Sequence, residues 1–116
     1  MRVRQRVRAL AIEAELGLVD QTKIVTAASE LARNTLDYGG GGLVEMEVVN
    51  GVRRGVRLTF TDEGPGIADV AEALRDGFST GDGLGLGLGG AKRLSSEFSI
   101  DSIVGKGTRV TIARWK

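Results

Sequence analysis

Glycine is the residue that most constrains this sequence, because the 116-residue chain has 18 glycines and one proline. The glycines gather in clusters between stretches of regular hydrophobic spacing, near residues 39–42, 64–66, 81–90 and 105–107. Such clustering excludes a collagen-like repeat or a linker and indicates turns and loops between helices and strands. We therefore expect loops whose backbone adopts conformations that other residues disfavour.

The hydrophobic spacing predicts two helices, a β-hairpin, a short helix, a further helix and a second β-hairpin. The helices are expected over residues 2–16, 20–37, 69–74 and 88–96, and the strands over residues 43–49, 56–61, 98–103 and 108–115. Gly17 is expected to end the first helix, and Asp20 to cap the second. The buried stripe of the second helix is expected to consist of Ile24, Ala27, Ala28, Leu31 and Leu36.

Each predicted strand has a single apolar face, so helices are needed on that face only. The economical architecture is a two-layer sandwich of helices on a sheet, within one domain over residues 1–116. Four arginines near the N-terminus are interpreted as the solvated face of the first helix, opposite an apolar stripe of Val3, Val7, Leu10 and Ala14. These arginines are Arg2, Arg4, Arg6 and Arg8.

Composition excludes several classes of function. The chain has neither histidine nor cysteine, which excludes histidine phosphotransfer within the chain, Ser-His-Asp hydrolysis, disulfides and thiolate metal sites. The net charge of +1 gives no whole-chain argument for a nucleic-acid partner. No apolar run has membrane-spanning length and no signal peptide is present, so we expect a cytoplasmic protein without a membrane partner.

A carboxylate and a carboxamide are expected to share one face of the second helix. Glu30 and Asn34 are four residues apart, which is about one helical turn. The amide oxygen of Asn34 suits Mg²⁺, and Glu30 suits the orientation or deprotonation of an attacking hydroxyl. By spacing alone, an exposed polar pair on a helix is the favoured interpretation, so this motif is weak in isolation.

An acidic corner follows the second predicted strand, in the sequence Asp62-Glu63-Gly64-Pro65-Gly66. The two glycines would allow a flat ring to approach the backbone, and Asp62 could accept a hydrogen bond from an exocyclic amine such as that of adenine. An ordinary turn with a solvated aspartate is the alternative. The later turn Gly105-Lys106-Gly107-Thr108 reads as a β-turn, with a hydroxyl at Thr108 that could reach a bound base through water.

A glycine-rich run over residues 81–90 leads into the fourth predicted helix. Its backbone N–H groups and the helix N-terminus suit a triphosphate, and the alternative is a loop without a ligand. The G-x-G-x-x-G match at Gly85, Gly87 and Gly90 is not a dinucleotide fingerprint, because no strand precedes it and no acidic residue lies about 20 positions later. A Walker A pattern is also absent from the sequence.

Together and in this order, the four segments resemble the nucleotide-binding motifs of the GHKL (histidine kinase-like) ATPase superfamily. The match is closer to one branch, the RsbT-type switch-protein serine/threonine kinases of bacterial partner-switching systems. The stretches that carry it are SELARN, DEGPGI, DGFSTGDGLGLGL, AKRL and EFSI, and the resemblance covers about residues 5–116. It implies the Bergerat ATP-binding fold, an α+β two-layer sandwich with a mixed sheet and helices on one face.

The resemblance also implies ATP and Mg²⁺ as ligands, with roles for particular residues. Asp62 would bind the adenine amine with support from Thr108, beside Gly64 and Gly66. Asn34 would hold Mg²⁺, and Glu30 would be the general base. Residues 77–82 would form a short ATP lid. The phosphates would be held by the backbone of Gly83, Leu84, Gly85, Leu86, Gly87 and Leu88.

The implied function is phosphorylation of a serine or threonine on a STAS-domain antagonist protein, in stress or sigma-factor regulation. The alternative is a nucleotide-dependent binding module that sequesters or activates a sigma factor or a phosphatase without turnover. A histidine-kinase catalytic domain is a third hypothesis, and it would need a phosphoacceptor on another chain because this one lacks histidine. The short predicted lid fits that class less well.

The sequence departs from the branch at its N-terminus. Members of the branch begin with a β-strand before the first helix, whereas here the predicted helix begins almost at Met1. The first family strand is therefore expected to be absent, which leaves a sheet edge exposed, covered by another chain or completed by residues outside this sequence. The oligomeric state stays open.

Overall fold

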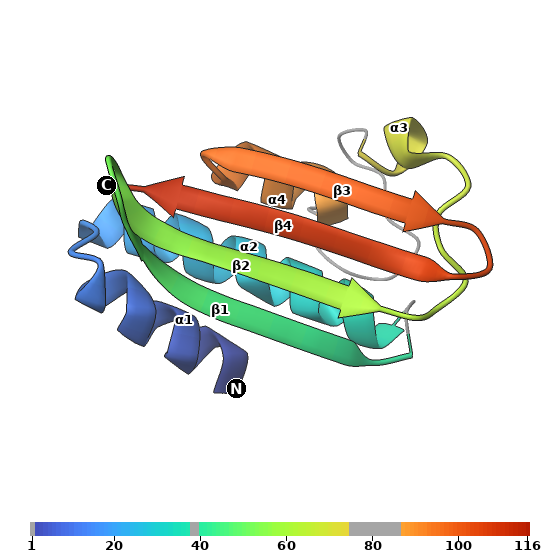
Figure 1. Cartoon of the computed structure of the whole chain (residues 1–116), viewed down its shortest axis with the longest axis horizontal. Helices are drawn as coiled ribbons and strands as arrows, with labels where there is room; N and C mark the ends of the chain where they lie inside the picture. The colour runs from blue at the N-terminus through green and yellow to red at the C-terminus, as the bar shows by residue number, and fades with distance from the viewer. Residues whose placement is uncertain (1, 38–39, 75–86) are drawn as a thin grey trace.

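The computed structural model of the protein describes residues 2–37, 40–74 and 87–116, and Figure 1 shows its elements. The helices are α1 (Arg2–Glu13), α2 (Leu18–Asp37), α3 (Val70–Ala73) and α4 (Gly87–Leu94). The strands are β1 (Gly42–Asn50), β2 (Arg54–Asp62), β3 (Glu97–Ile103) and β4 (Gly107–Trp115). Their order is the one that the hydrophobic spacing predicts, with boundaries shifted by a few residues.

The strands form one four-stranded sheet in the order β1-β2-β4-β3, and every neighbouring pair is antiparallel. Residues of α1, α2 and α4 share a single hydrophobic core with residues of β2 and β4, which confirms the two-layer sandwich. The expectation of a mixed sheet is wrong for the described residues. The two hairpins meet through β2 and β4, which run in opposite directions, so no parallel pair arises.

Side-chain alternation along the strands builds this core. In β2 the side chains of Val56, Leu58 and Phe60 face the helices and are buried, as predicted, and the intervening Arg57 and Thr59 face outward. The helix residues that are buried in the same core include Val7, Ala11, Ile24, Ala27, Ala28, Leu31, Leu88 and Ala91. The sheet therefore has one covered face and one solvated face.

The connection between α1 and α2 differs from its prediction. Glu15, not Gly17, takes the left-handed backbone conformation after α1, with φ of 64°. Asp20 lies inside the first turn of α2 and does not cap it. Its carboxylate instead pairs with Arg114 of β4, at 2.7 Å from Nη2 and 2.9 Å from Nε. Both guanidinium nitrogens reach the same carboxylate oxygen, Oδ1, so a half-buried ion pair between helix and sheet uses the side chain that the local pattern assigns to a cap.

One position of the predicted buried stripe of α2 is wrong. Leu36 is 63% exposed, and Thr35 is buried in its place. The helical period explains this, because Thr35 follows Leu31 by four residues and Leu36 follows it by five. The Thr35 hydroxyl donates a hydrogen bond to the Leu31 carbonyl at 3.0 Å, so its burial leaves no unpaired polar group. The other predicted members of the stripe are buried.

Part of the solvated face predicted for α1 is present. Arg4 and Arg6 are exposed, Arg8 is half-buried and donates to Gln21 Oε1 at 3.1 Å, and the side chain of Arg2 lies outside the described residues. The predicted apolar stripe packs on the core through Val3, Val7 and Leu10 of α1 and through Ala14, which follows the helix. Within the described ranges no helix is long and apolar enough to cross a membrane.

Candidate functional site

The elements that carry the predicted site converge at one end of the domain. Figure 1 shows the C-terminal ends of α2 and β2, the N-terminus of α4 and the β3–β4 turn at this end. β2 ends at Asp62, and Gly42 of β1 lies opposite it in register. A Cβ added to Gly42 would lie 2.9 Å from Thr35 Cγ2, so α2 ends close to the start of β1. The helix of Glu30 and Asn34 therefore leads to the strands around Asp62.

Glu30 and Asn34 share one side of α2, as their spacing predicts. Glu30 is only 9% exposed and Asn34 is half-buried. Neither side chain has a hydrogen bond or an ion pair within the described part of the chain. The only fully buried, unbonded side-chain polar atom there is Ser29 Oγ, so the Glu30 carboxylate keeps contact with solvent above a buried stem. A simple exposed polar pair does not fit this arrangement, whereas a group held ready for a ligand or a proton does.

The Asp62 corner is fixed by a local hydrogen bond. Asp62 is half-buried, and its Oδ1 accepts from the backbone N–H of Gly64 at 2.9 Å. This bond holds the carboxylate at the end of β2 and leaves the second oxygen available to a donor. The predicted interaction with an exocyclic amine is therefore compatible with the side chain's position.

Thr108 lies beside Asp62, as the predicted pocket requires. The two residues are register partners between β2 and β4, so their side chains stand on the same face of the sheet, about 5 Å apart at Cβ. Ser102 of β3 is the next register partner of Thr108, and their hydroxyl oxygens are 2.8 Å apart. Ser102 is not among the predicted site residues. The signal that could have identified it is its polar side chain at the inward position of β3 that follows Phe98 and Ile100.

The glycines of the corner and of the last turn serve close backbone packing. Gly66 has φ of +77°, and a Cβ there would meet the backbone of Ile103. The Gly105 N–H donates to the Pro65 carbonyl at 2.8 Å, so the corner is attached to the β3–β4 turn. A Cβ on Gly107 would meet the Asp62 carbonyl. Gly66 is therefore explained by packing against the turn, and the idea that it makes room for a flat ring is not needed to account for it.

Most of the predicted phosphate loop lies outside the described residues. This holds for Gly83, Leu84, Gly85 and Leu86, and for the predicted lid over residues 77–82. Gly87 begins α4, and the Leu88 side chain is buried in the core, so only the backbone of Leu88 remains available for a ligand. The first turn of α4 has no acidic residue and its last turn has Lys92 and Arg93, so no carboxylate within α4 itself opposes the positive end of the helix dipole.

The metal chemistry of this end of the domain is restricted. Among the described residues there is no group of three or more acidic, histidine or cysteine side chains that could hold a metal ion. A magnesium ion bound by one or two protein oxygens and by phosphates needs no such cluster. The amide oxygen of Asn34, with Glu30 one turn away, fits that mode of binding.

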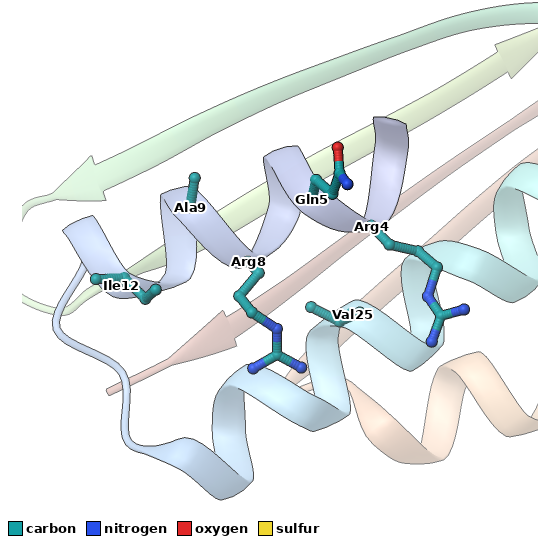
Figure 2. Close-up of a pocket in the computed structure, with 6 residues that line it drawn as sticks. All are labelled: Arg4, Gln5, Arg8, Ala9, Ile12 and Val25. Atoms are coloured by element: carbon teal, nitrogen blue, oxygen red, sulfur yellow. The ribbon is translucent and has the colours of Figure 1, made fainter. Parts of the chain in front are cut away.

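A shallow groove of about 390 Å³ lies elsewhere, between α1 and α2. Figure 2 shows its lining, which consists of Arg4, Gln5, Arg8, Ala9, Ile12 and Val25. None of the predicted site residues lines it. The groove is therefore separate from the predicted nucleotide site.

Comparison with known protein sequences places the chain among ATPases and kinases that it resembles along most of its length. Residues 19–116 match the family of histidine kinase-, DNA gyrase B-, and HSP90-like ATPases. The chain is 46% identical over 113 residues to the serine/threonine-protein kinase RsbT of Bacillus subtilis (strain 168), across 97% of this chain and 85% of that protein. It is 34% identical over 121 residues to the anti-sigma F factor of Geobacillus sp. (strain WCH70), across 95% of this chain and 81% of that protein.

Structural similarity supports the same fold. The chain superposes on full-length ShkA, solved in complex with AMPPNP, with a TM-score of 0.65 and 23% sequence identity. The match covers 97% of this chain and 28% of ShkA. At this identity the likeness shows the fold alone, which is the GHKL-type α+β sandwich.

Proposed function

The chain belongs to the family of histidine kinase-, DNA gyrase B- and HSP90-like ATPases, and from this premise we propose that residues 1–116 form one domain that uses ATP to phosphorylate serine or threonine on a partner protein. The identity to RsbT, a serine/threonine-protein kinase, is 46%, against 34% to an anti-sigma F factor. This difference favours phosphoryl transfer over binding without turnover.

The observation that carries the proposal is the state of Glu30. Its side chain is 9% exposed, yet its carboxylate has no partner within the described residues. The carboxylate meets solvent above a buried stem, so it is held in place while its oxygens stay open to a ligand or a substrate hydroxyl, which makes it a candidate for function. Asn34, one turn away on α2, adds a magnesium ligand to the same side of the helix. Transfer of a phosphoryl group to a hydroxyl uses a base for the hydroxyl proton and a metal ion at the phosphates, and Glu30 and Asn34 would supply the base and the metal ligand.

The nucleotide would lie between this helix and the end of the sheet. Asp62 would accept from the adenine amine with the oxygen that Gly64 leaves free, and Thr108 would stand beside it. Gly64 belongs to this corner through its bond to Asp62. The backbone of the glycine loop over residues 83–88 would hold the phosphates, with the N-terminus of α4 behind it.

In the reaction, Glu30 would act on the protein substrate. The substrate hydroxyl oxygen forms a bond to the γ-phosphorus, the bond from that phosphorus to the bridging oxygen of ADP breaks, and the hydroxyl proton passes to the Glu30 carboxylate. A Mg²⁺ held by Asn34 and the phosphates would neutralise the charge that they carry. Glu30 would thus act on the attacking hydroxyl, and the ion on the charge of the phosphates.

The partner that we propose is a STAS-domain antagonist protein in a cytoplasmic partner-switching pathway. The relatives named above are a serine/threonine-protein kinase and an anti-sigma factor, which supports a regulatory partner protein. A phosphatase or a sigma factor would be a second partner, bound rather than phosphorylated.

A phosphotransfer assay tests this function. The wild type is incubated with Mg²⁺, γ-³²P-ATP and a STAS-domain protein from the same organism, and label on the STAS chain is followed over time. Glu30→Gln keeps the shape of the side chain and removes the base, so we expect transfer to slow by about 100-fold or more while ATP still binds. Glu45→Gln, on the exposed face of β1, is the matched control and should transfer as the wild type does. Transfer by Glu30→Gln at the wild-type rate would refute the assignment.

A further inference from the structure

Ser102 joins three parts of the candidate pocket through one hydroxyl group. Its Oγ accepts from the backbone N–H of Ile67 at 2.7 Å, lies 2.8 Å from Thr108 Oγ1, and lies 3.3 Å from the Gly107 carbonyl oxygen. The residue is half-buried on β3, and its partners come from the glycine corner and from β4.

One arrangement of the hydroxyl protons satisfies all three contacts. The Ile67 N–H can only donate and the Gly107 carbonyl can only accept, so Ser102 uses its single proton toward Gly107. Thr108 must then donate its own proton to Ser102 Oγ. The lone pairs of Thr108 Oγ1 are then left for another donor, and beside it the second oxygen of Asp62 is an acceptor without a partner among the described residues.

We infer that Ser102 is a positioning residue that keeps Thr108 as a hydrogen-bond acceptor toward the purine amino group that the proposed site assigns to Asp62 and Thr108. The inference rests on the proposed nucleotide site and deepens it. The two N–H groups of a 6-amino purine can be shared between Asp62 and Thr108, directly or through one water. A 6-oxo purine would bring lone pairs against two acceptors, which a polar site rejects.

The experiment compares two nucleotides by calorimetry. Mg–ATP carries the amino group, and Mg–purine riboside 5′-triphosphate has hydrogen in its place. The quantity of interest is the ratio of the two Kd values, because a loss of folded protein or of phosphate contacts changes both affinities alike. We expect Ser102→Ala to raise the Kd of Mg–ATP by about 5- to 10-fold, which corresponds to the loss of about one hydrogen bond. The Kd of the purine riboside triphosphate should stay within about 2-fold of its wild-type value.

Matched variants separate the hydroxyl from the shape of the side chain. Ser102→Thr keeps the hydroxyl and Ser102→Val replaces it with a methyl group at nearly equal size, so the first should keep the ratio and the second should lose it. In a Thr108→Val background, Ser102→Ala should have no further effect on the ratio. Ser99→Ala changes an exposed serine of the same strand and serves as the control.

Each outcome decides the inference. If Ser102→Ala leaves the ratio of the two Kd values unchanged, whether or not both affinities fall, Ser102 is a structural link only. That result would overturn the inference while the proposed function stands. An additive effect of Ser102→Ala in the Thr108→Val background would also overturn it. Absence of binding of both nucleotides to the wild type would overturn the nucleotide site, and this inference with it.

Discussion

Replacing Asp62 with asparagine should weaken ATP binding by about 1–3 kcal/mol, which corresponds to a rise in Kd of about 5- to 150-fold. The substitution keeps the shape of the side chain and exchanges one acceptor oxygen for an amino group. It therefore isolates the hydrogen bond that the proposed site assigns to the adenine amine.

The magnitude follows from the bond to Gly64. One oxygen of Asp62 accepts the Gly64 N–H at 2.9 Å, and the other has no partner among the residues that the structure describes. In the variant, a single oxygen can serve Gly64 or the adenine amine, and the new amino group then meets a donor at the other place. One donor stays unpaired in either rotamer, at a half-buried position. Loss of a negative charge near a polyanionic ligand would by itself strengthen binding, so weaker binding cannot be attributed to charge.

Isothermal titration calorimetry with Mg–ATP measures the effect, with melting curves to show that both proteins are folded. Asp69→Asn is the matched control, because Asp69 also accepts a backbone N–H, that of Glu72 at 3.0 Å, at the N-cap of α3. The control should bind ATP within about 2-fold of the wild type, since asparagine caps a helix as well as aspartate does. Equal Kd values for the wild type and Asp62→Asn would refute the pocket.

Two further predictions concern stability. Gly107→Ala should lower the free energy of unfolding by about 2–5 kcal/mol, because φ is +130° there and a Cβ would meet the Asp62 carbonyl. Gly105→Ala, with φ of +83° and open space around the Cβ, should lower it by about 1–2 kcal/mol. Urea denaturation that ranks the two variants in the reverse order would contradict the packing. A hydrogen bond from Lys116 and the nearby charge of Arg54 lower the pKa of Glu15 below 4.5. The stabilisation from this lowered pKa is present at neutral pH and is lost as the pH falls below 4.5, so the melting temperature of Glu15→Gln should depend less steeply on pH in that range, and identical acid profiles would exclude the linkage.

The strands could be predicted because apolar and polar residues alternate along a strand that has one buried face and one solvated face. Val56, Leu58 and Phe60 are buried and Arg57 between them is half-exposed, as the period of two requires. The helix-start pattern at Asp20 was misleading, since its carboxylate has a stronger partner that lies 94 residues later in the chain. A capping pattern reports only which nearby backbone groups a side chain could bond, so it cannot predict a contact with a residue so distant in the sequence.

The site was predictable in its residue types but not in its connections. Spacing places Glu30 and Asn34 on one side of a helix, whereas the burial of Glu30 depends on what packs around that helix. Ser102 was missed because its role arises from strand register, which brings it next to Thr108, and from the corner that returns to Ile67. The packing of Gly66 against the adjoining turn could not be predicted from the sequence, and its place beside a bound adenine stays a prediction.

The central claim is that ATP binds at the end of the sheet marked by Asp62 and Thr108. Titration of the ¹⁵N-labelled protein with Mg–ATP tests it most directly, through the change in each backbone amide resonance. Outside the glycine loop over residues 83–88, we expect the largest changes over residues 62–67 and 102–108, and little change at Arg4 and Arg8 of the separate groove. Changes that are confined to that groove, or no changes at saturating Mg–ATP, would contradict it.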